Sequence, residues 1–360
     1  MEKKLISGKK MASFLDYTGV FFRKPFLFFR TLKGYLFAFL KSFLPPLHYL
    51  DIVTDYQCNL ACQHCFAAKF ARFQKKKLTL KEYQRLAKEA MELGAIHFSF
   101  QGGEVFLDKR IFEIIKAFQP KKNYISITTN GTLITSNLLK KLKKLGVDKL
   151  NFSLDSFDPK VHDRFRGKKG TFIKAMKALK MAQKFGFKVS VNTTVSHQNI
   201  FNDDLQKLFA WATKEKIALN PIFACPVGRW QENQKILLTP KDKQEINRWR
   251  KKSAWIRRDM ESNWFCFGCP AVKEVLYITP DGEVLPCPFL HFSLGNVKKE
   301  SLKKIRERGL KFKIFQKYHS QCLASENKKF LKKYLSLIFN QKLPLSFKKA
   351  EKLLKNYEEV

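Results

Sequence analysis

Cys58-Asn59-Leu60-Ala61-Cys62-Gln63-His64-Cys65 is the stretch of sequence that decides the fold. It follows an apolar run, residues 48–54, that the pattern predicts to be a strand. Three thiolates on one short loop can hold three irons of a four-iron cluster. Because such clusters normally take four cysteines, the fourth iron would stay open for a small molecule.

The C-x3-C-x2-C spacing, with His64 before the last cysteine and Phe66 after it, resembles the radical S-adenosylmethionine (SAM) superfamily. The resemblance implies a [4Fe-4S] cluster on Cys58, Cys62 and Cys65 that binds SAM and passes it one electron. The alternative is a zinc site, but zinc needs four ligands and His64 lies too close to its neighbours to serve easily. A disulfide framework fits poorly, because this long chain shows no signal peptide.

Strands and helices alternate between residues 48 and 223, which predicts βαβ units and a parallel sheet. The expected strands are Tyr49–Thr54, Ile96–Phe100, Tyr124–Thr128, Lys149–Leu154, Phe187–Thr194 and Ala218–Phe223. The expected helices are Thr79–Leu93, Asp108–Phe118, Ser136–Leu145, Thr171–Phe185 and Phe201–Lys214, the third with Ser136 as N-cap and Gly146 as C-cap. Six such units predict an α/β fold, a partial (β/α)6 TIM-like barrel. Ligands of these sheets sit at the carboxyl ends of the strands, which is where the cysteine loop falls.

The second predicted strand leads into Gln101-Gly102-Gly103-Glu104-Val105. Glycines let the backbone approach a ligand closely, and the acid can accept from an ammonium group. The resemblance assigns Gly102, Gly103 and Glu104 to a Gly-Gly-Glu-Pro motif at the SAM amino group, although Val105 replaces the proline. By itself, Gly-Gly-Glu fits any strand-to-helix turn.

Three further motifs match SAM-binding positions of the family. Asn130 stands in Thr128-Thr129-Asn130-Gly131, which could also be a simple turn. Ser153 and Asp155 stand in Ser153-Leu154-Asp155-Ser156, and Arg166 follows in a His-Asp…Arg-Gly pattern. The resemblance implies that Ser153 and Arg166 hold the SAM carboxylate, which suits a planar guanidinium; the alternative for Arg166 is a surface salt bridge. Asn192 is expected at the ribose or methionine end.

A second cysteine group lies near the C-terminus, where Asp281-Gly282 predicts a hairpin that brings Cys269 and Cys287 together. The spacing of Cys269, Gly282 and Cys287 resembles the opening of the SPASM/twitch extension, with Val272 at a usual glycine. The resemblance implies a second, auxiliary [4Fe-4S] cluster in a small α+β domain. Its ligands would be Cys269, Cys287, Cys322 and Cys266, with Cys225 a weaker choice. If Cys266 is not a ligand, one iron is open; a zinc ribbon on the same four cysteines is the alternative.

The chain carries 69 Lys+Arg against 31 Asp+Glu, a formal charge of +38 over 360 residues. An acidic partner is one interpretation, but lysines from Lys3 to Lys355 favour general compositional drift. Residues 21–50 hold too many basic residues for a membrane span. Phe29, Leu32, Leu36, Leu40 and Phe43 recur at helical spacing. This stripe could lie in a membrane interface or pack on the neighbouring domain.

Five segments follow: an amphipathic, basic and aromatic N-terminus (1–47), the radical SAM core (48–223), a connector (224–262), the auxiliary domain (263–325) and a lysine-rich helical tail (326–360). The predicted function is reductive SAM cleavage to a 5′-deoxyadenosyl radical that abstracts hydrogen from a peptide or cofactor precursor. The predicted partners are SAM, a reductant such as flavodoxin or ferredoxin, a peptide or small-molecule substrate, and an anionic membrane at the periphery of a cytoplasmic enzyme. A lipid or RNA substrate, and a non-catalytic iron–sulfur or zinc protein, are the alternatives.

Overall fold

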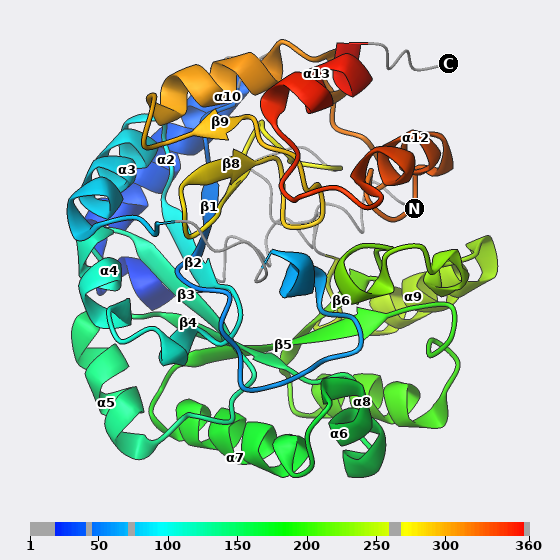
Figure 1. Cartoon of the computed structure of the whole chain (residues 1–360). Helices are drawn as coiled ribbons and strands as arrows, with labels where there is room; N and C mark the ends of the chain where they lie inside the picture. Colours follow the sequence, from blue (N-terminus) through cyan, green and yellow to red (C-terminus); the bar gives the residue numbers. More distant parts are fainter. Residues whose placement is uncertain (1–18, 41–44, 71–75, 259–267, 356–360) are drawn as a thin grey trace.

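The computed structural model describes residues 19–40, 45–70, 76–258 and 268–355. One nine-stranded sheet runs through these residues in the order β6-β5-β4-β3-β2-β1-β7-β8-β9. Its strands β1 to β6 are parallel and form the curved wall at the centre of Figure 1. They are β1 (Tyr49–Val53), β2 (His97–Gln101), β3 (Tyr124–Thr129), β4 (Lys149–Ser153), β5 (Lys188–Val195) and β6 (Ala218–Phe223).

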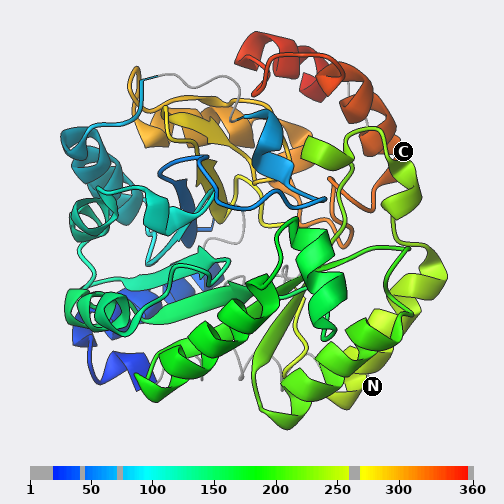
Figure 2. The same ribbon diagram turned by 60° about the horizontal axis from the view of Figure 1, so that its bottom comes forward.

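The helices between these strands cover the outer face of the sheet (Figures 1 and 2). They are α3 (Leu80–Glu92), α4 (Ile111–Ala117), α5 (Ser136–Leu145), α6 (Pro159–Arg166), α7 (Thr171–Lys184) and α8 (Asp203–Lys214). The buried side chains of α3, Tyr83, Leu86, Ala87 and Ala90, follow the helical period and join the main core. The predicted fold, a partial (β/α)6 barrel with a small C-terminal domain, is confirmed.

The ends of α5 show how the sequence sets a helix boundary. Gly146 ends the helix as predicted, in the left-handed conformation with φ 96°. The predicted N-cap was wrong by one residue, because Thr135, not Ser136, accepts the hydrogen bond from Leu138 N. Threonine in extended backbone before the first helical residue has the geometry that a cap requires.

The C-terminal domain continues the barrel sheet. Strand β7 (Val275–Ile278) pairs in parallel with β1, and the hairpin predicted at Asp281-Gly282 joins it to β8 (Glu283–Leu285), with Gly282 at φ 89°. Strand β9 (Gly295–Asn296) pairs with β8 and forms the edge of the sheet. The remaining helices are α10 (Leu302–Leu310), α11 (Lys313–Gln316), α12 (Lys328–Ile338) and α13 (Phe347–Lys355).

The segment expected to be a connector contains the 3-10 turns η4 (Gly228–Trp230) and η5 (Gln234–Ile236) and a full helix, α9 (Pro240–Lys252). Thr239 and Asp242 form a capping box at the start of α9, with Pro240 in its first turn. Further turns lie at η1 (Phe66–Lys69) and η3 (Val105–Leu107), and helix α2 (Pro25–Leu40) precedes the barrel.

None of the helices in the described ranges combines the length and apolar character that a membrane crossing requires.

Candidate active site

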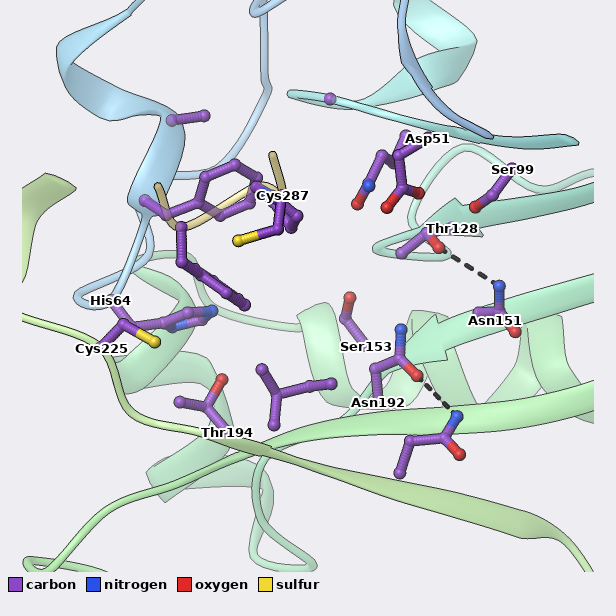
Figure 3. Close-up of a pocket in the computed structure, with 18 of the residues that line it drawn as sticks. Asp51, His64, Ser99, Thr128, Asn151, Ser153, Asn192, Thr194, Cys225 and Cys287 are labelled. Carbon is purple, nitrogen blue, oxygen red and sulfur yellow. Dashed lines mark hydrogen bonds between the residues drawn. The ribbon is translucent and has the colours of Figure 1, made fainter. Parts of the chain in front are cut away.

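A cavity of about 1010 Å³ lies inside the barrel and is lined by both cysteine groups. Figure 3 shows its wall, where polar side chains of β3, β4 and β5 face Cys287 of the C-terminal domain. The sequence-predicted site residues that line it are Cys58, Cys62, Cys65, Phe66, Gly102, Gly103, Asn130, Ser153, Arg166, Asn192, Cys269, Cys287 and Cys322. The structure therefore brings together residues that are up to 264 positions apart in the sequence (322 − 58).

The glycines after β2 hold the segment that leads from β1 into the cysteine loop. Gly103 N donates to Asp55 O at 3.0 Å, and Glu104 N donates to Gln57 O at 2.8 Å. A Cβ on Gly102 would stand 2.4 Å from Asp55 O, and one on Gly103 would stand 2.0 Å from Gln57 O. Only glycine permits this approach. The sequence predicted that these glycines let the backbone approach a ligand. In the structure, they instead let it approach the segment just before Cys58.

The other side of the cysteine loop is held by the end of α6 and by η4. Ala61 N donates to Arg166 O at 3.2 Å, and Arg229 N donates to Cys65 O at 3.1 Å. Gly228, at φ 64°, brings its Cα so close that a Cβ would stand 2.2 Å from Cys65 O. Backbone contacts therefore fix the loop from both sides, which is what a rigid ligand set requires.

The thiols of the loop suit a metal cluster. Cys58 is exposed, Cys62 is buried and Cys65 is half-buried. All three residues line the cavity. Burial, with smaller contributions from the neighbouring Cys62, Glu104 and Cys65, raises the pKa of Cys58 to about 11. A bound metal cluster offsets this effect because coordination deprotonates a thiol. In the described ranges, no three Cys, His, Asp or Glu side chains converge as the ligands of one metal ion would.

Glu104 does not line the cavity; its carboxylate lies behind the turn after β3. It accepts hydrogen bonds from Thr129 Oγ1 and Asn130 N, both at 2.8 Å. Burial raises the pKa of Glu104 to about 7, and the hydrogen bonds from Asn130 and Thr129 only partly oppose this shift. Glu104, predicted to contact the SAM amino group, is thus placed by the structure as a support of the turn that carries Asn130.

Asp155 and Arg166 form a buried ion pair in which Arg166 Nη2 lies 2.5 Å from Asp155 Oδ2. Burial alone would raise the pKa of Asp155, but the charge of Arg166 holds it below its ordinary value. Arg166 Nη1 also donates to Cys62 Sγ at 3.8 Å. Arg166 lines the cavity and Asp155 does not. Asp155 therefore acts from behind the cavity wall, where its carboxylate orients the Arg166 guanidinium.

His64 packs against aromatic rings. Its ring stacks on Phe165 with centroids 4.7 Å apart and an interplanar angle of 11°, and Trp230 lies at 5.8 Å. Burial lowers the pKa of His64 to about 3, so the ring is neutral at physiological pH. These contacts anchor the loop between Cys62 and Cys65 to α6 through Phe165 and to η4 through Trp230.

The auxiliary cysteines Cys269, Cys287 and Cys322 line the same cavity as the loop cysteines. Burial raises the pKa of Cys287 well above its ordinary value, and Cys269 and Cys322 add to the shift. Cys266 lies outside the described residues. Cys225 also lines the cavity, and its Sγ donates to Phe223 O at 3.4 Å.

Sequence reasoning missed four cavity-lining residues with amide or hydroxyl groups: Asn59, Thr128, Asn151 and Asn220. Asn151 Nδ2 donates to Thr128 Oγ1 at 3.2 Å, and Asn220 Nδ2 donates to Asn192 Oδ1 at 2.9 Å (Figure 3). Asn59 Oδ1 accepts from Asn130 Nδ2 at 2.9 Å, which links the cysteine loop to the turn after β3. The available signal was polar residues at alternate positions of strands whose other face is apolar.

Comparison with known proteins decides the family. Residues 52–212 match the radical SAM superfamily, and residues 269–327 match the SPASM iron–sulfur cluster-binding domain. The chain is a radical SAM enzyme with a SPASM-type domain. Such enzymes bind a [4Fe-4S] cluster with SAM in the first domain and auxiliary iron–sulfur clusters in the second.

Relatives of this radical SAM enzyme differ in their products. It is 25% identical over 305 residues to the AdoMet-dependent heme synthase of Methanosarcina barkeri, covering 76% of this chain and 86% of that protein. It is 35% identical over 162 residues to the Fe-coproporphyrin III synthase of the same organism, covering 45% and 40%. It is 26% identical over 302 residues to the subtilosin biosynthesis protein AlbA of Bacillus subtilis, covering 79% and 66%.

Solved structures show the same fold. Streptococcus suis SuiB bound to its precursor peptide SuiA matches with a TM-score of 0.62 at 20% identity, covering 88% of this chain and 78% of SuiB. Native anSMEcpe with bound AdoMet and a peptide matches with a TM-score of 0.59 at 18% identity, covering 85% and 96%.

Proposed function

We propose that this radical SAM enzyme abstracts a hydrogen atom from a peptide or a cofactor precursor held between the two cysteine groups. The observation that carries the proposal is one cavity lined both by Cys58, Cys62 and Cys65 and by Cys269, Cys287 and Cys322. A volume of about 1010 Å³ lies at the upper end of the range for ligand pockets, which suits a site that holds SAM together with a substrate.

The cysteine loop would hold the SAM cluster, and the strand ends would orient SAM. With SAM bound, the reduced cluster supplies one-electron cleavage to methionine and a 5′-deoxyadenosyl radical. Gly102, Gly103, Asn130, Ser153 and Asn192 line the space beside the loop and offer backbone and amide or hydroxyl groups. Glu104 fixes the Asn130 turn and places a carboxylate behind it. Arg166 contributes a buried cation whose Nε has no hydrogen-bond partner among the described residues.

The auxiliary cysteines would hold a second cluster that accepts the electron left on the substrate radical or anchors the substrate. Cys266 or Cys225 would be the fourth ligand; without either, one iron is open to the substrate. The first electron would come from a cytoplasmic reductant such as flavodoxin or ferredoxin.

Two substrate classes follow from the relatives. The names of the heme synthase and the Fe-coproporphyrin III synthase indicate porphyrin precursors, and AlbA belongs to the synthesis of a bacteriocin. Deuterium transfer distinguishes them. The reconstituted enzyme would be incubated anaerobically with SAM, dithionite and either iron-coproporphyrin deuterated at its propionates or a deuterated precursor peptide.

Mass spectrometry of 5′-deoxyadenosine gives the result. Deuterium in the product from one class identifies the substrate class. Uncoupled 5′-deoxyadenosine without deuterium from either class would contradict the proposed substrates while leaving SAM cleavage intact.

A further inference from the structure

Helix α2 turns its large apolar side chains outward. Phe22, just before the helix, is 92% exposed, and Phe26 and Phe29 are 63% and 66% exposed. Leu32 and Leu36 follow at 56% and 54%. These positions recur every three or four residues, so they form one stripe along the helix. The sequence left two roles open for the predicted stripe, a membrane interface or packing on the neighbouring domain. Phe29, Leu32 and Leu36 are exposed and do not show that packing. The Leu40 side chain and Phe43 lie outside the described residues.

The inward face of the same segment packs Val20 and Leu27 against Ile96 and Tyr124 at the N-terminal end of the barrel, and polar contacts surround this small core. Lys24 is buried, donates to Asn123 O at 2.8 Å and to Gly146 O at 2.9 Å, and pairs with the Asp148 carboxylate. Arg30 donates to Ala95 O and to the Asn123 side chain. These acceptors precede β2, β3 and β4, so α2 closes the end of the barrel opposite the cysteine loop.

Cations frame the exposed stripe. Lys122 Nζ lies 5.8 Å from the centroid of the Phe26 ring, and Lys33 Nζ lies 5.6 Å from that of Phe37. The side chain of Arg23 is 48% exposed, and Lys121 and Lys144 are exposed in the loops and helix ends around the same end of the barrel. An apolar stripe within a basic frame is the pattern of a helix that lies in the headgroup region of a bilayer.

We propose that the N-terminal end of the barrel docks on an anionic lipid bilayer through α2, with Phe22, Phe26, Phe29, Leu32 and Leu36 buried among the headgroups. The basic frame favours anionic lipid over a second copy, because two copies would bring like charges together. The docked face lies at the end of the barrel opposite the cysteine loop, because the groups that Lys24 and Arg30 contact precede β2, β3 and β4.

Vesicle co-sedimentation of the full chain tests this proposal. Vesicles would contain phosphatidylglycerol and phosphatidylcholine, or phosphatidylcholine alone. We expect the native chain to bind the anionic vesicles, and the double variant Phe26→Glu/Phe29→Glu to bind at least about tenfold more weakly. The matched control is Ile173→Glu/Phe201→Glu, which places two charges on exposed apolar side chains of other elements and should bind like the native chain.

Circular dichroism and SAM cleavage would first confirm that each variant is folded. Three results would overturn the proposal. Equal vesicle binding by the native chain and the α2 variant would assign the binding to charge alone. No binding to anionic vesicles by the native chain would exclude the bilayer. A dimer that the α2 variant dissociates, without vesicle binding, would assign the stripe to a second copy.

Discussion

Arg166 links three parts of the site at the scale of a single residue. Its guanidinium lies 2.5 Å from the Asp155 carboxylate and donates to Cys62 Sγ, while its carbonyl accepts from Ala61 N. Both charges are buried, so removal of one partner leaves the other without compensation. This arrangement makes the ion pair a structural support of the cysteine loop as well as a part of the cavity wall.

Asp155→Ala should therefore destabilise the fold by about 3 kcal/mol, because it leaves a buried guanidinium unpaired. Urea unfolding of the metal-free protein under reducing conditions measures this change. The exposed acid Asp203 gives a control, since Asp203→Ala should change the unfolding free energy by less than about 0.5 kcal/mol. A change in Asp155→Ala as small as that of the control would show that the pair adds nothing to stability.

Glu104 should make stability depend on pH. Its folded pKa of about 7 exceeds the ordinary 4.5, so the folded protein holds the proton more tightly than the unfolded chain. Its contribution is therefore fully present below about pH 4.5 and is lost as the pH rises through about 7. As the pH rises over this range, the unfolding free energy of the native chain should therefore fall relative to that of Glu104→Gln.

Thermal unfolding of the metal-free protein between pH 5 and 8 measures the Glu104 effect. Glu113→Gln, on the exposed face of α4, is the control and should follow the native chain at each pH. A constant difference between the native chain and Glu104→Gln across the range would show that Glu104 ionises normally.

At the scale of elements, the turn after β2 and the segment after β1 form a single unit. Gly103→Ala would place a Cβ 2.0 Å from Gln57 O, so one backbone must shift. We expect loss of iron from the SAM cluster and at least a tenfold loss of SAM cleavage, about 1.4 kcal/mol or more. Gly19→Ala is the control, because a Cβ there meets no atom within 4 Å. Native iron content and activity in Gly103→Ala would refute the contact.

Helix α12 supports the auxiliary cysteines. Tyr334 Oη accepts from His291 N at 2.6 Å and donates to Phe289 O at 3.0 Å, which holds the loop after Cys287. Tyr334→Phe leaves a buried N–H without its acceptor, which costs about 1–3 kcal/mol. Iron should fall from roughly eight to roughly four atoms per chain, while SAM cleavage without substrate persists. Unchanged iron content would show that the loop holds without this tyrosine.

The sequence predicted the elements that have a clear apolar periodicity. It did not predict features that depend on tertiary contacts. The six barrel strands and five of the helices between them follow from alternating apolar runs. Helix α9 was missed because its sequence, PKDKQEINRWRKK, offers few apolar positions. The hairpin at Gly282 was predicted from two residues, but its pairing with β1 was not, since no local pattern encodes a partner strand.

The same limit applies to the site. Cysteine spacing and the Gly-Gly-Glu and Arg-Gly motifs predicted residues that line one cavity. They could not show that Glu104 and Asp155 stand behind its wall, because burial depends on how α6 and the turns pack. The positive φ of 67° at Val272 explains why a glycine is usual at that position; here a valine adopts it, with its side chain packed against Gly309.

At the scale of the whole molecule, the two ends of the barrel have different tasks. The carboxyl ends of the strands carry the cysteines and the cavity, and the opposite end carries the basic, apolar surface of α2. The C-terminal domain joins its strands to the barrel sheet through β7, which lies beside β1 (Figure 1). Its Cys269, Cys287 and Cys322 line the cavity.

The central claim is that Cys58, Cys62 and Cys65 form the SAM-cleaving site. Its most direct test is the yield of 5′-deoxyadenosine from anaerobically reconstituted protein with dithionite and SAM. We predict product from the native chain and from the Cys269/Cys287/Cys322→Ala variant, and none from the Cys58/Cys62/Cys65→Ala variant. Product at the native level from that last variant, or none from a native chain that carries both clusters and its substrate, would contradict the claim.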